Sequence, residues 1–191
     1  MLFEGRELSW GELNALANRY AHCLRKRGVG HGDCVSLLME NRIEFLAVLA
    51  ALSKLGAIAG LINTKLQGRQ LVHCIAVTQS VACIVGGELA QVLEPAIGEL
   101  DLEQGADYLW VADSGSKKVP AWALDLTAAS ATAGTANPAT TRKVTLGDRA
   151  LYIFTSGTTG LPKAAVMSHK RFLLSATGSA RMSLQLDEGD R

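Results

Sequence analysis

Short apolar runs alternate with amphipathic segments over the first 112 residues, and this alternation constrains the fold more than any other feature. The strand-like runs are residues 35–39, 57–62, 81–85 and 108–112, and the helix-like segments are 41–55, 67–79 and 88–98. The runs are apolar enough to be buried on both faces, as parallel strands are. Because the links are short, each strand–helix–strand unit predicts a right-handed crossover. The sequence therefore predicts an α/β fold, with a mostly parallel sheet, βαβ units and flanking helices.

An earlier helix is marked at both ends. Ser9 stands three residues before Glu12, which is the spacing of a capping box, so the helix is expected to begin after Ser9. Apolar residues then recur at helical spacing up to Leu24. Gly28 is a natural stop, and the basic residues 25–27 suit the negative end of the helix dipole.

Residues 45–62 approach the length of a membrane span, with Lys54 as their only charge. A central charge is costly in a bilayer, and Gly56 and Gly60 interrupt the helical pattern. The segment is therefore interpreted as a helix, a glycine stop and a buried strand. The start of the chain lacks a basic and then apolar pattern, so no secretory signal peptide is expected.

The segment 152–163 runs from a β-branched, aromatic strand into a loop rich in hydroxyl groups and glycine. Glycine lets the backbone approach a ligand closely, hydroxyls donate to phosphate oxygens, and lysine adds a mobile charge. The segment therefore predicts a polyphosphate-binding loop. Its residues are Tyr152, Ile153, Phe154, Thr155, Ser156, Gly157, Thr158, Thr159, Gly160, Leu161, Pro162 and Lys163.

Spacing separates this loop from two other nucleotide-binding motifs. In a Walker loop the lysine directly follows the second glycine, whereas Lys163 follows Gly160 by three residues. The chain also has no G-x-G-x-x-G fingerprint of a dinucleotide site. An ordinary turn between two strands is the remaining alternative. A strand is expected to leave the loop at 164–167, followed by a helix at about 170–182.

The loop resembles the phosphate-binding signature of the adenylate-forming (AMP-binding) superfamily. Further segments resemble its fatty-acid transport protein / very-long-chain acyl-CoA synthetase branch, in the same order: residues 39–45, 54–56, 61–64, 71–74 and 152–165. The resemblance covers residues 3 to 191. It implies ATP-dependent activation of a long- or very-long-chain fatty acid to an acyl-adenylate and then to acyl-CoA. The implied cofactors are ATP, Mg²⁺ and coenzyme A.

The resemblance also implies roles for single residues. Thr155 is expected to contact Mg²⁺ as well as phosphate, and Lys163 to lie near the phosphates. No catalytic residue is assigned within the chain. His169 is interpreted as a capping or core histidine, because adenylation of a carboxylate needs no general base. A synthetase for another carboxylic acid, or a nucleotide-binding remnant without catalysis, is the alternative function.

The implied organisation is an incomplete N-terminal AMP-binding domain over residues 1–191. It divides into a βαβ portion (1–112), a variable connection (113–148) and the strand, loop, strand and helix of 149–191. The connection is rich in Ala, Thr, Ser and Gly and predicts a mobile spacer. Later motifs of the superfamily are not found in the chain, so the chain alone is expected to be inactive and to expose apolar surfaces that favour oligomers.

Composition limits the partners. A net charge of +1 gives no footprint for nucleic acid. The four cysteines contain no C-x-x-C pair and predict reduced thiols in a cytoplasmic protein, with no metal site supported by spacing. The expected partners are a fatty acid and coenzyme A, and peripheral association with a membrane remains an alternative.

Overall fold

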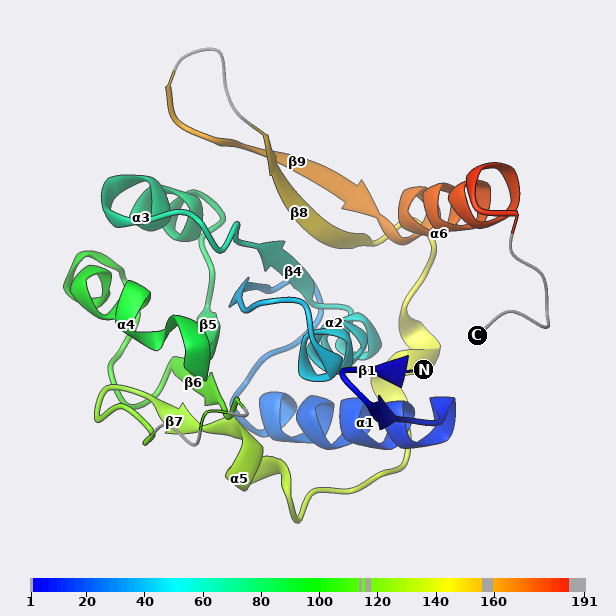
Figure 1. Ribbon diagram of the computed structural model, residues 1–191, viewed down its shortest axis with the longest axis horizontal. Coiled ribbons are helices and arrows are strands. Elements are labelled where there is room, and N and C mark those ends of the chain that lie inside the picture. The colour runs from blue at the N-terminus through cyan, green and yellow to red at the C-terminus, as the bar shows by residue number, and fades with distance from the viewer. Residues whose placement is uncertain (1, 114, 116–117, 156–159, 186–191) are drawn as a thin grey trace.

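A computed structural model gives the structure of residues 2–113, 115, 118–155 and 160–185, which build a seven-stranded sheet with the order β7-β6-β5-β3-β4-β8-β9 (Figure 1). Neighbouring strands are parallel except for β8 and β9, which are antiparallel. The strands are β3 (Cys34–Leu38), β4 (Ile58–Leu61), β5 (Ala82–Gly86), β6 (Tyr108–Val111), β7 (Leu124–Asp125), β8 (Arg149–Thr155) and β9 (Lys163–Ser168). The predicted α/β class with a mostly parallel sheet is confirmed.

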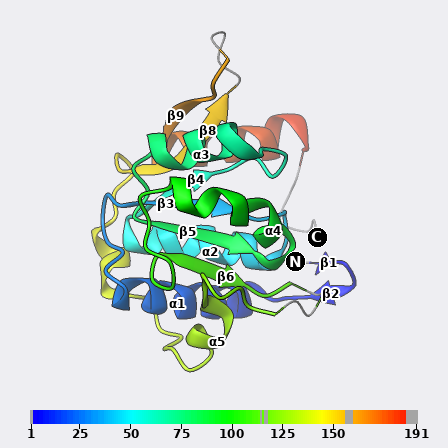
Figure 2. The same ribbon diagram turned by 90° about the vertical axis from the view of Figure 1, so that its left-hand side faces the viewer.

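Helices cover both faces of the sheet (Figure 2). The helices of one face are α1 (Trp10–Lys26), α2 (Ile43–Leu55) and α5 (Leu126–Ser130), and those of the other are α3 (Gly68–Val77) and α4 (Ala90–Leu93). Successive side chains of a strand point to opposite faces. Leu37 accordingly joins the core beneath α1 and α2, whereas Leu38 joins the core beneath α3 and α4.

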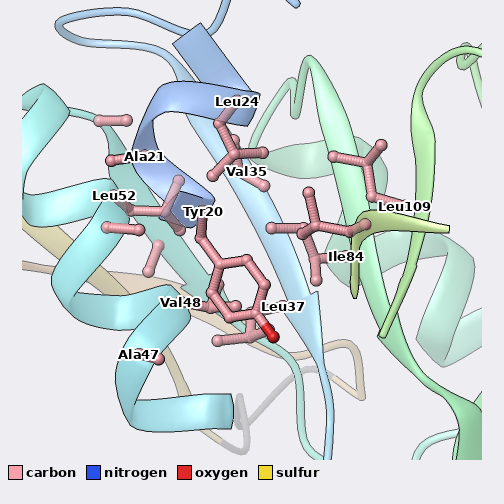
Figure 3. Packing of buried hydrophobic residues seen from close by; sticks show 14 of the residues in the cluster. Tyr20, Ala21, Leu24, Val35, Leu37, Ala47, Val48, Leu52, Ile84 and Leu109 are labelled. Atoms are coloured by element: carbon pink, nitrogen blue, oxygen red, sulfur yellow. The ribbon is translucent and has the colours of Figure 1, made fainter. Parts of the chain in front are cut away.

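The core beneath α1 and α2 is built around Tyr20, whose ring lies between α2 and β3 (Figure 3). Tyr20 is 1% exposed, and Leu37 of β3 and Leu52 of α2 are fully buried beside it. Burial, with a smaller contribution from the carboxylate of Glu44, raises the pKa of Tyr20 to about 12. The hydroxyl therefore stays neutral over the physiological pH range.

Local signals fix the helix ends. Ser9 and Glu12 form the predicted capping box at the start of α1. The membrane-length stretch is divided as predicted, because α2 ends at Leu55, Gly56 adopts a left-handed conformation and β4 follows. None of the helices formed by the described residues is long and apolar enough to cross a membrane.

Two parts of the chain differ from the predicted elements. The helix expected at 88–98 is broken into a 3-10 turn (Gly87–Leu89), the short α4 and a second 3-10 segment (Glu94–Glu99). Pro95 explains the second interruption, at the end of α4, because proline has no backbone N–H and clashes with the preceding turn. A small antiparallel hairpin, β1 (Leu2–Phe3) with β2 (Arg6–Glu7), was not predicted.

The connection 113–148 contains regular elements that its composition did not predict. Its described part contains β7, α5 and a 3-10 segment (Ala139–Lys143). Asn18 Nδ2 donates to the carbonyl of Thr135 at 2.6 Å, and Lys54 Nζ donates to Asn137 Oδ1 at 2.7 Å. Side chains of α1 and α2 therefore hold the connection in place, and its Ala/Thr/Ser/Gly composition gave no sign of these contacts.

Beyond β9 the chain forms α6 (His169–Gly178) and a π-helical turn (Ser179–Ser183). Ser168 caps α6 by accepting from the backbone N–H of Arg171 at 3.3 Å. No residue of α6 is buried. Large apolar side chains are exposed on β9 and α6, as the sequence predicts for part of the surface: Val166, Phe172, Leu173 and Leu174. Whether this surface forms oligomers stays a prediction.

Gly56→Ala is expected to lower the free energy of unfolding by more than about 1 kcal/mol, because φ at Gly56 is +70° and a Cβ there would meet His31 Cδ2 at 2.5 Å. Urea unfolding of both proteins measures this loss. In a His31→Ala background the contact is gone and only the backbone strain remains, so the loss should be smaller. Equal losses in the two backgrounds would mean that the His31 contact contributes nothing.

Candidate functional site: the ends of β4 and β8

The predicted phosphate-binding segment lies where β4 and β8 end side by side. These strands are parallel, with Leu61 opposite Ile153, so their carboxyl ends meet at one edge of the sheet. A cavity of about 220 Å³ opens at this edge. Its lining comes from the end of β4, from α3 and from both sides of the loop: Asn63, Leu66, Gln70, Phe154, Thr155, Gly160 and Pro162. Ligands of open α/β sheets bind outside the carboxyl ends of the strands, and the cavity has that position.

The strand part of the segment anchors the loop. Ile153 packs against the core beneath α1 and α2, and Phe154 packs against the core beneath α3 and α4. The half-buried Tyr152 accepts a hydrogen bond at its hydroxyl from Arg149 Nη1 at 3.4 Å. These side chains hold β8 between both layers of helices, and they leave Thr155 exposed as the last residue of the strand.

The two ends of the loop are brought together. Thr155 and Lys163 are opposite each other in the antiparallel pairing of β8 with β9. Directly opposite residues of such a pair have Cα atoms about 4.5–5.5 Å apart. The exposed Lys163 ammonium and the Thr155 hydroxyl therefore share one mouth of the loop. Four predicted contact residues lie outside the described residues: Ser156, Gly157, Thr158 and Thr159.

The exit of the loop has a defined backbone. Gly160 has φ of +96°, a conformation that side-chain-bearing residues rarely adopt, and nothing lies within 4 Å of the position of a Cβ. Leu161 is half-buried, and the carbonyl oxygen of Pro162 lies 3.0 Å from His73 Nε2 on α3. The residues that approach Lys163 are thus fixed partly by α3, a helix far away in the sequence.

The described residues fit a magnesium ion only together with phosphate. No group of three His, Cys, Asp or Glu side chains in the described part of the chain could hold a metal ion. Thr155 lines the cavity, and no described lining residue carries a carboxylate, whereas Mg²⁺ is typically held by one or two carboxylates together with water and phosphate oxygens. The predicted role of Thr155 at Mg²⁺ is compatible with this position and stays a prediction.

None of the four cysteines is among the described residues that line the cavity. All four are buried and free. Burial raises the pKa of Cys74 to about 11 and that of Cys83 to about 12.

His169 lies away from the loop. It is the first residue of α6, at the opposite end of β9, and its backbone N–H donates to the carbonyl of Asp148 at 3.0 Å. Its Nε2 is buried without a hydrogen-bond partner in the described structure. The cap is formed by Ser168, so the half-buried His169 is next to the cap and is neither the capping nor a core residue, and its exclusion from a general-base step stays a prediction.

Sequence reasoning missed a charged network that lies at the same edge of the sheet as the cavity, beyond the carboxyl ends of β3 and β5. The strands β3 and β5 are neighbours, and their following segments leave toward opposite faces of the sheet. Arg42, 13% exposed, donates there to the carbonyls of Ala112 at 2.7 Å and Val111 at 3.1 Å. It also pairs with Glu44 at 3.0 Å and Glu88 at 3.4 Å. The sequence around Arg42 indicates only a family resemblance and does not predict these contacts.

Asn63 and Gln70 are cavity residues that sequence reasoning also missed. The available signal was topological: Asn63 directly follows the strand predicted at 57–62, and the ends of neighbouring parallel strands meet at one edge. Asn63 also shapes the entry to α3, because its Oδ1 accepts from the backbone N–H of Lys65 at 2.9 Å. The sequence does not reveal Gln70 as a cavity residue, because its place in the lining depends on α3 lying beside the loop.

Comparison with known proteins gives the family. The model of the AMP-binding enzyme family matches residues 1–191. The medium/long-chain-fatty-acid–CoA ligase FadD6 of Mycobacterium tuberculosis is 36% identical over 191 residues, which is 98% of this chain and 29% of that protein. Long-chain fatty acid transport protein 1 of Bos taurus is 35% identical over 181 residues, which is 93% of this chain and 27% of that protein. The chain thus spans less than a third of the length of these curated relatives.

Solved structures agree with this assignment. The anthranilate CoA ligase AuaEII, in complex with anthranoyl-AMP, superimposes with a TM-score of 0.84 at 26% identity, covering 98% of this chain and 35% of that one. The inhibitor-bound N-terminal domain of FACL13 from Mycobacterium tuberculosis gives a TM-score of 0.68 at 29% identity, covering 85% of this chain and 37% of that one. The chain belongs to the AMP-binding enzyme family, and its relatives there include fatty-acid–CoA ligases and long-chain fatty acid transport proteins.

Proposed function

We propose that this chain supplies the phosphate-binding region of an enzyme that activates a long- or very-long-chain fatty acid with ATP and transfers the acyl group to coenzyme A. The observation that carries the proposal is the pairing of Thr155 with Lys163 at the mouth of the loop, beside a cavity at the carboxyl ends of β4 and β8. A hydroxyl and an ammonium at that place suit an anionic ligand.

The proposed chemistry has two steps. The carboxylate oxygen of the acid attacks the α-phosphate of ATP, so an acyl-adenylate forms and pyrophosphate leaves. The thiol of coenzyme A then attacks the acyl carbon and AMP leaves. Preorganised donors at the loop stabilise the charge that develops on the leaving pyrophosphate.

The residues of the chain have distinct parts in this proposal. The hydroxyl hydrogen of Thr155 would be donated to a phosphate oxygen and its oxygen would coordinate Mg²⁺, and Lys163 would lie near the β- and γ-phosphates. Bound Mg²⁺ would supply additional positive charge near the bridging oxygen. Gly160 permits the chain to turn sharply at the exit of the loop. Ile153 and Phe154 keep β8 fixed so that these donors are positioned before the nucleotide arrives.

The preference for a fatty acid is supported by the names of the relatives and not by the cavity. FadD6 is a medium/long-chain-fatty-acid–CoA ligase, and the Bos taurus relative is a long-chain fatty acid transport protein. AuaEII is an anthranilate CoA ligase, so an aromatic acid is the main alternative substrate. A cytoplasmic enzyme that acts at a membrane surface fits a long-chain acid, and this location is part of the proposal.

Acid-dependent exchange of labelled pyrophosphate into ATP is expected from the protein produced from its own gene. The exchange should require a long-chain or very-long-chain acid and Mg²⁺, and EDTA should abolish it. Benzoate and anthranilate should support little exchange. Exchange with the aromatic acids alone would reject the fatty-acid assignment, and no exchange with any acid would reject adenylation.

The intact mass of the same preparation shows whether the protein that catalyses the exchange is the 191-residue chain, whose mass is 20.2 kDa, or a longer protein. Calorimetry with Mg-ATP on the 191-residue chain separates binding from turnover. Heat of binding without exchange would support the alternative of a nucleotide-binding protein without catalysis.

A further inference from the structure

One side-chain contact ties α3 to the exit of the phosphate-binding loop. His73 Nε2 lies 3.0 Å from the carbonyl oxygen of Pro162, although the two residues are 89 positions apart in the sequence. His73 belongs to the segment 71–74 that resembles the fatty-acid transport branch, and neither the core nor the proposed chemistry accounts for it so far.

The position of His73 on α3 directs it to the loop. Residues three apart on a helix share a face, and Gln70, three positions earlier, lines the cavity beside Thr155. The core-facing side of α3 is formed by Leu71, Cys74 and Ile75, which are buried. His73 itself is half-buried, so its ring is not required to fill the core.

The chemistry of the contact fixes which atom carries the hydrogen. The carbonyl oxygen of Pro162 can only accept, so His73 Nε2 must be the donor. The pairing of β8 with β9 ends at Thr155 and Lys163, so Pro162 lies beyond the last pair of the ladder. The β8–β9 ladder therefore holds Lys163 on one side, and the hydrogen bond from α3 holds the preceding residue, Pro162, on the other.

We propose that His73 is a positioning residue for ATP: by holding Pro162, it keeps Lys163 and Thr155 at the mouth of the loop in the arrangement that binds the phosphates. The inference rests on the proposed function for the identity of the ligand. It assigns no contact between His73 and ATP, so the effect must pass through the backbone of Pro162 and Lys163.

Three variants test this role. His73→Leu removes the donor, whereas His73→Gln keeps an N–H at a similar reach. His22→Leu is the matched control, because His22 Nε2 also contacts a backbone carbonyl, that of Ala136 at 2.9 Å, and His22 is also half-buried. That contact holds the connection against α1 and lies away from the loop residues.

His73→Leu is expected to raise KM for ATP about fivefold, which corresponds to about 1 kcal/mol for a neutral hydrogen bond. KM for the acid and for coenzyme A should stay unchanged. His73→Gln should restore most of the wild-type KM, and His22→Leu should leave all three KM values unchanged. Equal rises for all substrates, or no rescue by glutamine, would overturn the positioning role.

Amide hydrogen exchange over residues 160–168 tests the contact independently of turnover. His73→Leu should accelerate exchange there without nucleotide, and His73→Gln and His22→Leu should not. Acceleration in a protein that shows no pyrophosphate exchange would reject the proposed function and retain the contact. Unchanged exchange in His73→Leu would overturn the inference even where the wild-type protein is an active synthetase.

Discussion

Replacing Arg42 by methionine is expected to lower the free energy of unfolding by about 3 kcal/mol, because one change removes four polar contacts from a largely buried place. Arg42 donates to the carbonyls of Val111 and Ala112 and pairs with Glu44 and Glu88. Methionine preserves the apolar stem of the side chain and removes only the guanidinium. Urea unfolding followed by circular dichroism measures the loss.

The expected loss of stability is large because Arg42→Met leaves the former partners of the guanidinium, Glu88 and two carbonyls, without their donor. Glu88 is 21% exposed at its side chain, and its Oε1 also accepts from the backbone N–H of Glu40 at 2.9 Å, so it cannot turn freely to water. Without Arg42, its charge stays in the protein without its cationic partner. The carbonyls of Val111 and Ala112 lose a donor at the end of β6, and an unsatisfied buried acceptor carries its own penalty.

Arg6→Met provides the matched control. Arg6 also contacts Glu44, at 3.6 Å, but its side chain is 64% exposed, so the loss should be at most about 1 kcal/mol. Adding Glu88→Gln to Arg42→Met should recover part of the stability, because the uncompensated charge is then removed. A loss below about 1 kcal/mol for Arg42→Met would show that the network is energetically no better than a surface pair.

Local patterns account for what the sequence predicts well. The apolar runs that became β3, β4, β5 and β6 are short and continuous, and those properties belong to the strands themselves. The ends of α1 and α2 were predictable for a similar reason, since the Ser9–Glu12 pair and Gly56 act on their own helices. The loop is also a local pattern, because residue types within twelve positions predict phosphate binding, and that function stays a prediction.

Contacts between distant segments account for what the sequence does not predict. Arg42 reaches carbonyls about 70 positions away, and nothing in its own segment indicates them. The connection 113–148 lacks an apolar period, yet Thr135 and Asn137 are held by side chains of α1 and α2. His73 is the same case at the site, because its partner is known only once α3 lies beside the loop.

Lys163→Ala is expected to lower kcat/KM for ATP by about a hundredfold, a loss typical of removing one preorganised donor to a developing charge. Lys163 is exposed at the first position of β9, opposite Thr155, so its side chain has no packing role that the substitution would disturb. KM for the acid should change by less than about twofold, because Lys163 is proposed to contact the phosphates of ATP and not the acid. Initial rates of pyrophosphate exchange, with each substrate varied in turn, give both values.

The control for Lys163 is Lys170→Ala. Lys170 is an exposed lysine on the first turn of α6, past the end of β9 that lies away from the loop, so removing its charge should leave both kinetic constants unchanged. Lys163→Arg should retain part of the activity, because it keeps the charge but exchanges a compact ammonium for a planar guanidinium. Equal losses for ATP and acid in Lys163→Ala would place Lys163 outside the phosphate site. A selective loss for ATP, with Lys170→Ala unaffected, would tie the charge of Lys163 to the nucleotide, because both lysines are exposed and only one stands at the mouth of the loop.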